Sequence, residues 1–359
     1  MEPAAARRHS SARHRDGVLD VTVIVQEGGY PSEAIGPIEV FHSAGSLWNQ
    51  LHGERPLPRF RVRTASHDGR PVTSLCGLTI APEHSIEEIR RTDIVIVPAA
   101  GWEVRPELPA STALVAWLRR MHARGAWIAG ICTGVAFLAE AGLVDGRIAT
   151  THWAAAEAMR IRYPGVNWQA EQFVTEDGRM LCAGGAYSWM DLSLHLVEKF
   201  CGHEVALQCA KALLLSMPRA SQSSYSSVAL SRPHSDDRIR KSEQYLREHF
   251  RSGVSIEALA KRAAMSPRNF IRRFKAATGR LPGEYLQLLR VAAAKELLES
   301  DAMPIQTVCA HVGYEDLASF RKVFRRHAGM KPAEYRERFA RARFAHGDPS
   351  IDSRPQPTG

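Results

Sequence analysis

Five residues near the middle of the chain have the spacing of a nucleophile turn, Gly130-Ile131-Cys132-Thr133-Gly134. They end an apolar run, 126–131, and are followed by a segment typical of a helix. This G-x-C-x-G pattern matches the strand–turn–helix logic of G-x-S-x-G, with cysteine in place of serine. The glycines permit a sharp turn, and the start of a helix stabilises a thiolate. The pattern therefore predicts a reactive or sensing cysteine at the edge of a sheet.

Two other titratable residues stand where they could join Cys132. His152 ends the apolar run 148–151, and Glu33 follows the first apolar run of the chain, 18–26. The carboxyl ends of the strands of an open parallel sheet form one edge, and sites gather there. We therefore expect thiol, imidazole and carboxyl to meet at that edge.

Two tryptophans should border the same edge. Trp102 follows a strand-like segment that ends at Gly101, and Trp153 follows His152. Indole faces combined with the carboxylate of Glu33 suit a cationic amine or quaternary-ammonium ligand. The alternative, that both tryptophans pack at domain or dimer surfaces, fits the sequence at least as well.

The elements that position these residues alternate between strand and helix. Short, almost continuous apolar runs separated by helical segments indicate a parallel sheet covered on both faces. The expected fold class is an α/β, flavodoxin-like N-terminal domain over residues 18–215. Its expected strands are 18–26, 59–65, 93–97, 126–131 and 148–151, and its expected helices include 35–44 and 111–124.

The last third of the chain contains an internal repeat. Phe270, Phe274, Gly279, Pro282 and Tyr285 recur fifty residues later as Phe320, Phe324, Gly329, Pro332 and Tyr335. Each copy consists of a short helix, a tight turn and a longer helix, and 282–300 is expected to be one continuous helix between the copies. The predicted C-terminal domain, 236–344, is therefore all-α with two helix-turn-helix motifs.

The longer helix of each copy separates apolar from basic residues. In 266–278 the phenylalanines face a core, while Arg268, Arg272 and Lys275 stand on other faces. In 316–328, Ser319, Lys322 and Arg325 lie away from the apolar stripe. One anchored face and one face of Arg, Lys and small polar groups is what a DNA-reading helix needs.

The net charge of +9 is concentrated in the same region. Residues 18–215 carry 17 basic and 21 acidic side chains, whereas 236–344 carry 23 basic and 13 acidic ones. The excess indicates a polyanionic partner such as double-stranded DNA, although a merely solvated basic surface has the same composition.

Composition excludes several other classes. The chain has no apolar run long enough for a membrane span, and its six cysteines form no C-x-x-C pair and have no metal-ligand spacing. Because the first 17 residues have no apolar core, we expect no secretory leader. We expect a cytoplasmic protein with no membrane association, no metal and no cofactor. The segments 1–17 and 345–359 are expected to be disordered tails, the first of them basic, and the Ser- and Pro-rich stretch 216–235 a linker.

Residues 236–340 resemble the AraC/XylS type of transcriptional regulators, on the stretch ALAKRAAMSPRNFIRRFKAATGRLPGEY and its repeat IQTVCAHVGYEDLASFRKVFRRHAGMKPAEY. The resemblance implies two recognition helices that enter successive major grooves. Its base-facing positions fall on Arg268, Ile271, Arg272, Ala318, Ser319 and Lys322, with Lys275 and Arg325 beside them. Ile271 and Ala318 can offer only apolar contacts, for example to thymine methyls.

Residues 18–210 resemble the ThiJ/PfpI family, relatives of the class I glutamine amidotransferases. The resemblance places the family's elbow cysteine at Cys132, its histidine at His152 and its carboxylate at Glu33. The later H-x-E pair of the amidotransferases is missing, so glutamine hydrolysis is not expected. The set is open to three interpretations: a ligand or redox sensor, inert inherited geometry, or a catalyst.

Together the two resemblances imply a transcription regulator and not an enzyme. The regulator is expected to activate transcription, and its amidotransferase-like domain is expected to sense a small metabolite. Relatives with both domains include regulators of arginine, carnitine and glycine betaine use, which is compatible with a cationic amine or amino acid as effector. RNA polymerase and a second copy of the chain, in a homodimer, are the other expected partners. The alternative is a ThiJ/PfpI-type cysteine enzyme acting on small carbonyl or amide compounds, and a weaker one is an architectural DNA binder.

Overall fold

The structure is a computed structural model that describes residues 17–102, 109–217, 234–300 and 303–339. The chain forms two compact units that divide between Val228 and Ala229, and each unit is described by itself. The predicted tails, except Gly17, and most of the predicted linker 216–235 lie outside the described residues.

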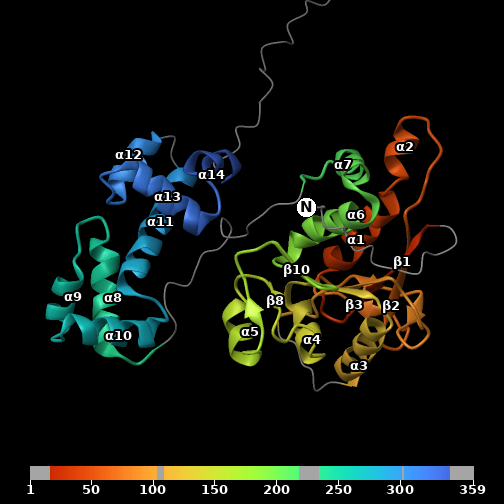
Figure 1. The fold of residues 1–359 in the computed structure, drawn as a ribbon, viewed down its shortest axis with the longest axis horizontal. Coiled ribbons are helices and arrows are strands. Elements are labelled where there is room, and N and C mark those ends of the chain that lie inside the picture. The colour runs from red at the N-terminus through yellow and green to blue at the C-terminus, as the bar shows by residue number, and fades with distance from the viewer. Residues whose placement is uncertain (1–16, 103–108, 218–233, 301–302, 340–359) are drawn as a thin grey trace, which may run out of the picture. The chain divides into compact units, whose positions relative to one another are not determined.

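The first unit is built on a seven-stranded sheet of order β10-β11-β7-β6-β1-β2-β5 (Figure 1). All neighbouring strands run parallel except β10, which pairs antiparallel with β11 at one edge. This agrees with the expected α/β, flavodoxin-like class. The strands are β1 Leu19–Ile24, β2 Phe60–Ser66, β5 His84–Ser85, β6 Ile94–Val97, β7 Trp127–Ile131, β10 Val174–Asp177 and β11 Met180–Ala183.

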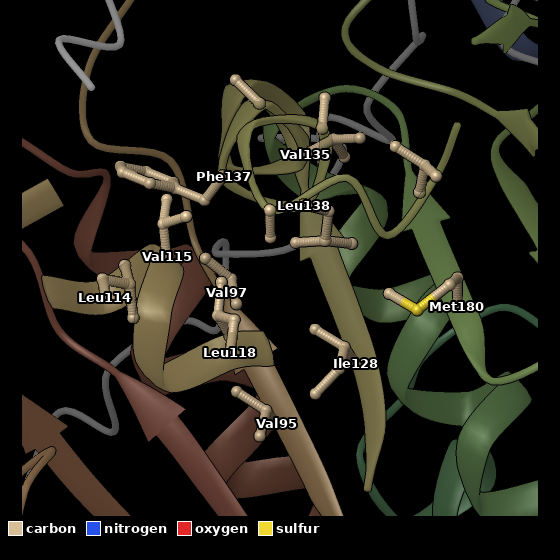
Figure 2. Close-up of a cluster of buried hydrophobic side chains, with 14 of the residues drawn as sticks. Val95, Val97, Leu114, Val115, Leu118, Ile128, Val135, Phe137, Leu138 and Met180 are labelled. Carbon is tan, nitrogen blue, oxygen red and sulfur yellow. The ribbon is translucent and has the colours of Figure 1, made fainter. Parts of the chain in front are cut away.

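Helices cover both faces of this sheet, because its central strands are apolar on both sides. One buried cluster joins the strands to α3 and α4, and Figure 2 labels members of it from β6, α3 and α4, among them Val95, Leu118 and Phe137. A second cluster joins the opposite face to α1, α6 and α7. The helices of this unit are α1 Pro31–Ser43, α2 Leu47–Leu51, α3 Pro109–Ala123, α4 Val135–Glu140, α5 Ala156–Arg162, α6 Trp189–Cys201 and α7 His203–Ala212.

Two sequence-based expectations need correction, and one hairpin was not expected. The strand expected at 148–151 does not extend the main sheet: β8, Ile148–Ala149, pairs only with β9, Asn167–Trp168. The hairpin of β10 and β11 was not anticipated, although Asp177-Gly178 is a turn signal and Gly178 has a φ of 64°. Helix α1 begins at Pro31, four residues before the expected start, since proline favours the first turn of a helix. A further small sheet pairs β3 Val72–Thr73 with β4 Thr79–Ile80.

The second unit is all-α, as predicted, and its two halves repeat one design (Figure 1). Phe274 packs edge-on against Tyr285 with ring centroids 5.4 Å apart, and Phe324 packs against Tyr335 in the same way at 5.5 Å. The predicted connecting helix is a single element of 19 residues, α11. The helices are α8 Asp237–His249, α9 Ile256–Arg262, α10 Pro267–Thr278, α11 Pro282–Ser300, α12 Ile305–His311, α13 Leu317–Ala328 and α14 Pro332–Phe339.

Within the described ranges, no helix combines the length and the apolar character that crossing a bilayer requires.

Candidate functional site

The elbow after β7 holds Cys132 in a strained conformation. Its φ of 57° lies in the left-handed region, which a residue other than glycine adopts at a cost of about 1–3 kcal/mol. The glycines of the motif serve close packing instead of the turn itself: a Cβ on Gly134 would overlap the carbonyl oxygen of Val97, and one on Gly130 would press on Val135. The surrounding sheet therefore fixes the thiol at the carboxyl edge.

Glu33 meets Cys132 from the first turn of α1. Its Oε2 accepts a hydrogen bond from the backbone amide of Ala99 at 2.7 Å, and its side chain is fully buried. Burial raises the pKa of Glu33 to about 8, opposed by the hydrogen bonds from Ala99 and Cys132. The carboxyl is therefore largely protonated near neutral pH and sits beneath the edge of the sheet, out of contact with solvent.

The thiol of Cys132 is not activated by its position. Burial raises its pKa well above the ordinary range, the neighbouring carboxyl of Glu33 raises it further, and hydrogen bonds from Thr133 only partly oppose this. The expected stabilisation of a thiolate by the start of a helix is thus outweighed by desolvation. Thr133, which sequence reasoning passed over, also ties the elbow to the next loop, because its hydroxyl donates to the carbonyl of Gly101 at 2.5 Å.

The other predicted residues of this edge gather beside the elbow. Thr151 donates to the carbonyl of Cys132 at 2.8 Å, which holds His152 next to the turn. The ring of His152 contacts both Trp102, at 5.0 Å between centroids, and Trp153, at 5.2 Å. Its Nδ1 accepts from the amide of Ala154, and burial lowers the pKa of the ring. Among the described residues, no hydrogen bond joins the imidazole to Cys132.

In the second unit, α10 presents a basic face above a buried one. Ser266 caps its start, Gly279 ends it in the left-handed conformation, and Phe270 and Phe274 are fully buried. Arg268, Arg272 and Lys275 are exposed, and Ile271 is half-buried. Arg273 differs from these exposed basic residues in a way that the sequence could not show. It pairs with Asp236, the residue that caps α8, and is therefore held within the unit.

The exposed face of α13 is less basic at its start than the exposed face of α10. Ala318, Ser319, Lys322 and Arg325 are all exposed, as expected for a reading face. Asp316 accepts from the amides of Ala318 and Ser319, at 3.1 and 2.7 Å, and its pKa is lowered chiefly by a hydrogen bond from the Ser319 side chain. The hydroxyl of Ser319 is thus shared with the helix cap.

Comparison with known proteins assigns families to both units. Residues 20–199 match the model of the DJ-1/PfpI family, and residues 259–338 match that of a helix-turn-helix domain. The HTH-type transcriptional regulator CdhR of Pseudomonas aeruginosa is 30% identical over 289 residues, which cover 80% of this chain and 84% of that protein. The HTH-type transcriptional regulator GbdR of the same species is 28% identical over 291 residues, 80% of this chain and 77% of that one.

An enzyme shares part of the first unit only. The isonitrile hydratase of Pseudomonas putida is 30% identical over 151 residues, which cover 42% of this chain and 64% of that enzyme. The two regulators, in contrast, match across both units. The chain therefore belongs to the AraC-type helix-turn-helix transcriptional regulators that carry an N-terminal DJ-1/PfpI domain.

Proposed function

We propose that this regulator places α10 and α13 in successive major grooves on one side of its DNA site. At 1.5 Å per residue, the 19 residues of α11 span about 28 Å, close to the roughly 34 Å of one DNA turn. A connecting helix of this length can hold the two readers in neighbouring major grooves.

We assign roles within each helix from side-chain chemistry. Arg268 and Arg272 suit the O6 and N7 acceptors of guanine, whereas Ile271 and Ala318 suit thymine methyls. Lys322 and Ser319 would contact bases from the second helix. Lys275 and Arg325, one turn further along, suit phosphates and set the register without reading sequence.

The observation that carries this proposal is the duplication of one core under two exposed polar faces. Phe270 and Phe274 lie 5.5 Å apart with an interplanar angle of 51°, and Phe320 and Phe324 lie 5.7 Å apart at 53°. Such a repeated anchor orients both helices alike, which favours a shared role for them.

Mapping of bound sites across the genome followed by fluorescence anisotropy on an enriched site tests the proposal. We expect Arg268→Ala to lose about 1–3 kcal/mol of binding free energy on that site, the value of one good bidentate base contact. Lys241→Ala, an exposed cation on α8, is the matched control and should bind like wild type. Equal affinities for all three proteins would contradict the assignment of α10.

We further propose that the first unit receives the regulatory signal at the carboxyl edge of its sheet, where Trp102, His152 and Trp153 gather above the buried Cys132 and Glu33. The bound effector would alter DNA binding or the contact with RNA polymerase, and the regulator would act as an activator and a homodimer. Reporter transcription from the mapped promoter, measured with wild type and Trp153→Ala, tests this: equal induction by the same metabolite would contradict it.

A second candidate function is cysteine-dependent turnover of small carbonyl or amide compounds, favoured by the strained elbow and the partial similarity to isonitrile hydratase. The raised pKa of Cys132 argues against it, since the neutral thiol is a poor nucleophile. We expect the wild-type full-length protein to turn over methylglyoxal no faster than Cys132→Ala does. Turnover that is present in wild type and lost in Cys132→Ala would favour the enzyme.

A further inference from the structure

A cavity of about 590 Å³ opens at the carboxyl edge of the sheet, beside the elbow but separate from it. Its lining includes Trp102 but none of Glu33, Cys132, His152 and Trp153. The volume lies within the roughly 300–1,000 Å³ typical of small-molecule sites. No motif of the sequence points to it, because its residues come from several strands and helices that are far apart along the chain.

The cavity occupies the switch point of the sheet. Strand β1 leads through α1 to β2 on one side, while β6, its other neighbour, leads through α3 to β7 on the opposite side. Segments that leave adjacent strands in opposite directions open a crevice, and open α/β sheets bind ligands there. Residues 25–27, after β1, and 100–102, after β6, both line the cavity.

The floor of the cavity is apolar. Ile24, Ile86, Leu114 and Phe137 line it, and each is almost completely removed from solvent. Trp102 adds a large wall that is 54% exposed, although tryptophan is highly buried on average. Such a floor favours the apolar or aromatic body of a ligand, since that surface leaves water on binding.

The rim of the cavity is polar and carries more negative than positive charge. Its acidic and basic side chains are Glu27, Asp68 and Arg70, together with the imidazole of His67, and Arg70 pairs with Asp68 at 3.7 Å. Glu27 accepts from the amide of Thr73 at 3.0 Å and has no ion pair among the described residues. The carboxylate of Glu27 therefore leaves a negative charge in the cavity that the exposed indole of Trp102 also lines, and both groups attract cations.

We propose that this cavity is a ligand site distinct from the elbow and that it takes an amphipathic monocation, an apolar or aromatic body carrying one amine. The proposal rests on the proposed function, because it names the ligand class of the same sensing unit. Trp102 is the wall shared with the elbow, since its ring also contacts His152. A ligand against Trp102 thus touches the group of residues that borders Cys132.

Calorimetry on the full-length protein with three probes of one shape tests the ligand class. Phenethylamine carries the cation, 2-phenylethanol is neutral and phenylacetate is anionic. We expect saturable binding of phenethylamine with one site per chain, and at least tenfold weaker binding of phenylacetate. No saturable binding of phenethylamine, or equal binding of the amine and the acid, would overturn the proposal.

Substitutions locate the site. Ser111→Trp places an indole in the cavity from α3 and should weaken phenethylamine binding at least tenfold, whereas Ala116→Trp, on the exposed face of the same helix, should not. Glu27→Gln keeps an acceptor for Thr73 and should weaken the amine about fivefold while leaving 2-phenylethanol unchanged; Glu54→Gln is its control. Unchanged amine binding by both Ser111→Trp and Glu27→Gln would place the probe elsewhere and overturn the site.

The same samples separate this proposal from the proposed function. If the protein binds its mapped DNA site specifically but binds no phenethylamine, only the proposal of a ligand site in the cavity is contradicted. Protein that binds the amine at this cavity but does not discriminate the mapped site from random DNA contradicts the DNA-reading assignment alone.

Discussion

In the first unit the residues with reactive side chains are buried, whereas in the second unit the residues that would meet a partner are exposed above a repeated core. Burial decides the chemistry of Cys132 and Glu33, since it raises the pKa of both. Exposure decides that of Arg268 and Arg272, whose charges stand in solvent. The first arrangement suits a signal that alters packing, and the second suits a rigid reader of a polyanion.

The largest expected effect concerns the repeated core. Phe274→Ala and Phe324→Ala each remove a fully buried ring and should each lower the free energy of unfolding by about 3–5 kcal/mol. Because the two cores are alike, the two losses should agree within about 1 kcal/mol. Hydrogen exchange of the amides of α10 and α13 measures them separately, and a loss confined to one repeat would break the equivalence of the two halves.

The next effect concerns the buried carboxyl of the first unit. The pKa of Glu33 is about 8 in the folded chain against an ordinary value of 4.5, so the folded state holds a proton that the unfolded chain has released. Stability should therefore fall as pH rises from about 5 to 8, with a slope that approaches about 1.4 kcal/mol per pH unit. Glu33→Gln should remove this slope, because the amide does not titrate.

Urea unfolding followed by tryptophan fluorescence measures that slope in the full chain. All seven tryptophans precede residue 190, so the signal reports on the first unit alone. Glu54→Gln, an exposed glutamate of the same unit, should keep the wild-type slope. A slope unaltered in Glu33→Gln would show that other groups cause it.

A smaller effect sharpens the comparison within the second unit. Arg272→Ala should cost about 1–3 kcal/mol of binding to the mapped site and should relax the base preference at one position. Ser319→Ala should cost less, because its hydroxyl already serves Asp316 at the helix cap. Anisotropy titrations on the site and on single-base variants provide both values, and a larger loss for Ser319→Ala would reverse the ranking.

The smallest effect concerns phosphate contacts. Lys275→Ala and Arg325→Ala should weaken binding to the mapped site and to random DNA almost equally. Each substitution should also reduce the slope of log affinity against log salt by about 1. Titrations between low and moderate salt measure the slope. If either variant changes base preference and keeps the salt slope, that residue reads bases and has been misassigned.

Sequence patterns predicted the second unit well because its determinants are local. The phenylalanine spacing, the cap at Ser266 and Gly279 at the helix end fix α10 within fourteen residues, and the same signals recur for α13. The two exposed faces follow directly once the buried stripe is known. Helices α8 and α14, which lie outside the repeated helix pairs, were not predicted, and neither were pairings across the unit, such as that of Arg273 with Asp236.

The first unit was predicted less completely because its determinants are distant. The elbow and its neighbours were found from motifs. The direction in which the pKa of Cys132 shifts, however, depends on burial of the thiol beneath α1, and sequence spacing carries no information on that burial. Strand β8 is apolar like its neighbours, yet it pairs outside the main sheet. The cavity beside Trp102 draws on segments from Ile24 to Phe137 and has no sequence pattern of its own.

Methylation protection of guanine N7 on the mapped site tests the central claim most directly, because N7 faces the major groove. We expect two protected clusters about 10 base pairs apart on one side of the duplex for each bound chain. Arg272→Ala should expose guanines in one cluster, and Lys322→Ala should expose them in the other. A single protected cluster, or two clusters that neither substitution alters, would contradict the assignment of α10 and α13 as paired readers.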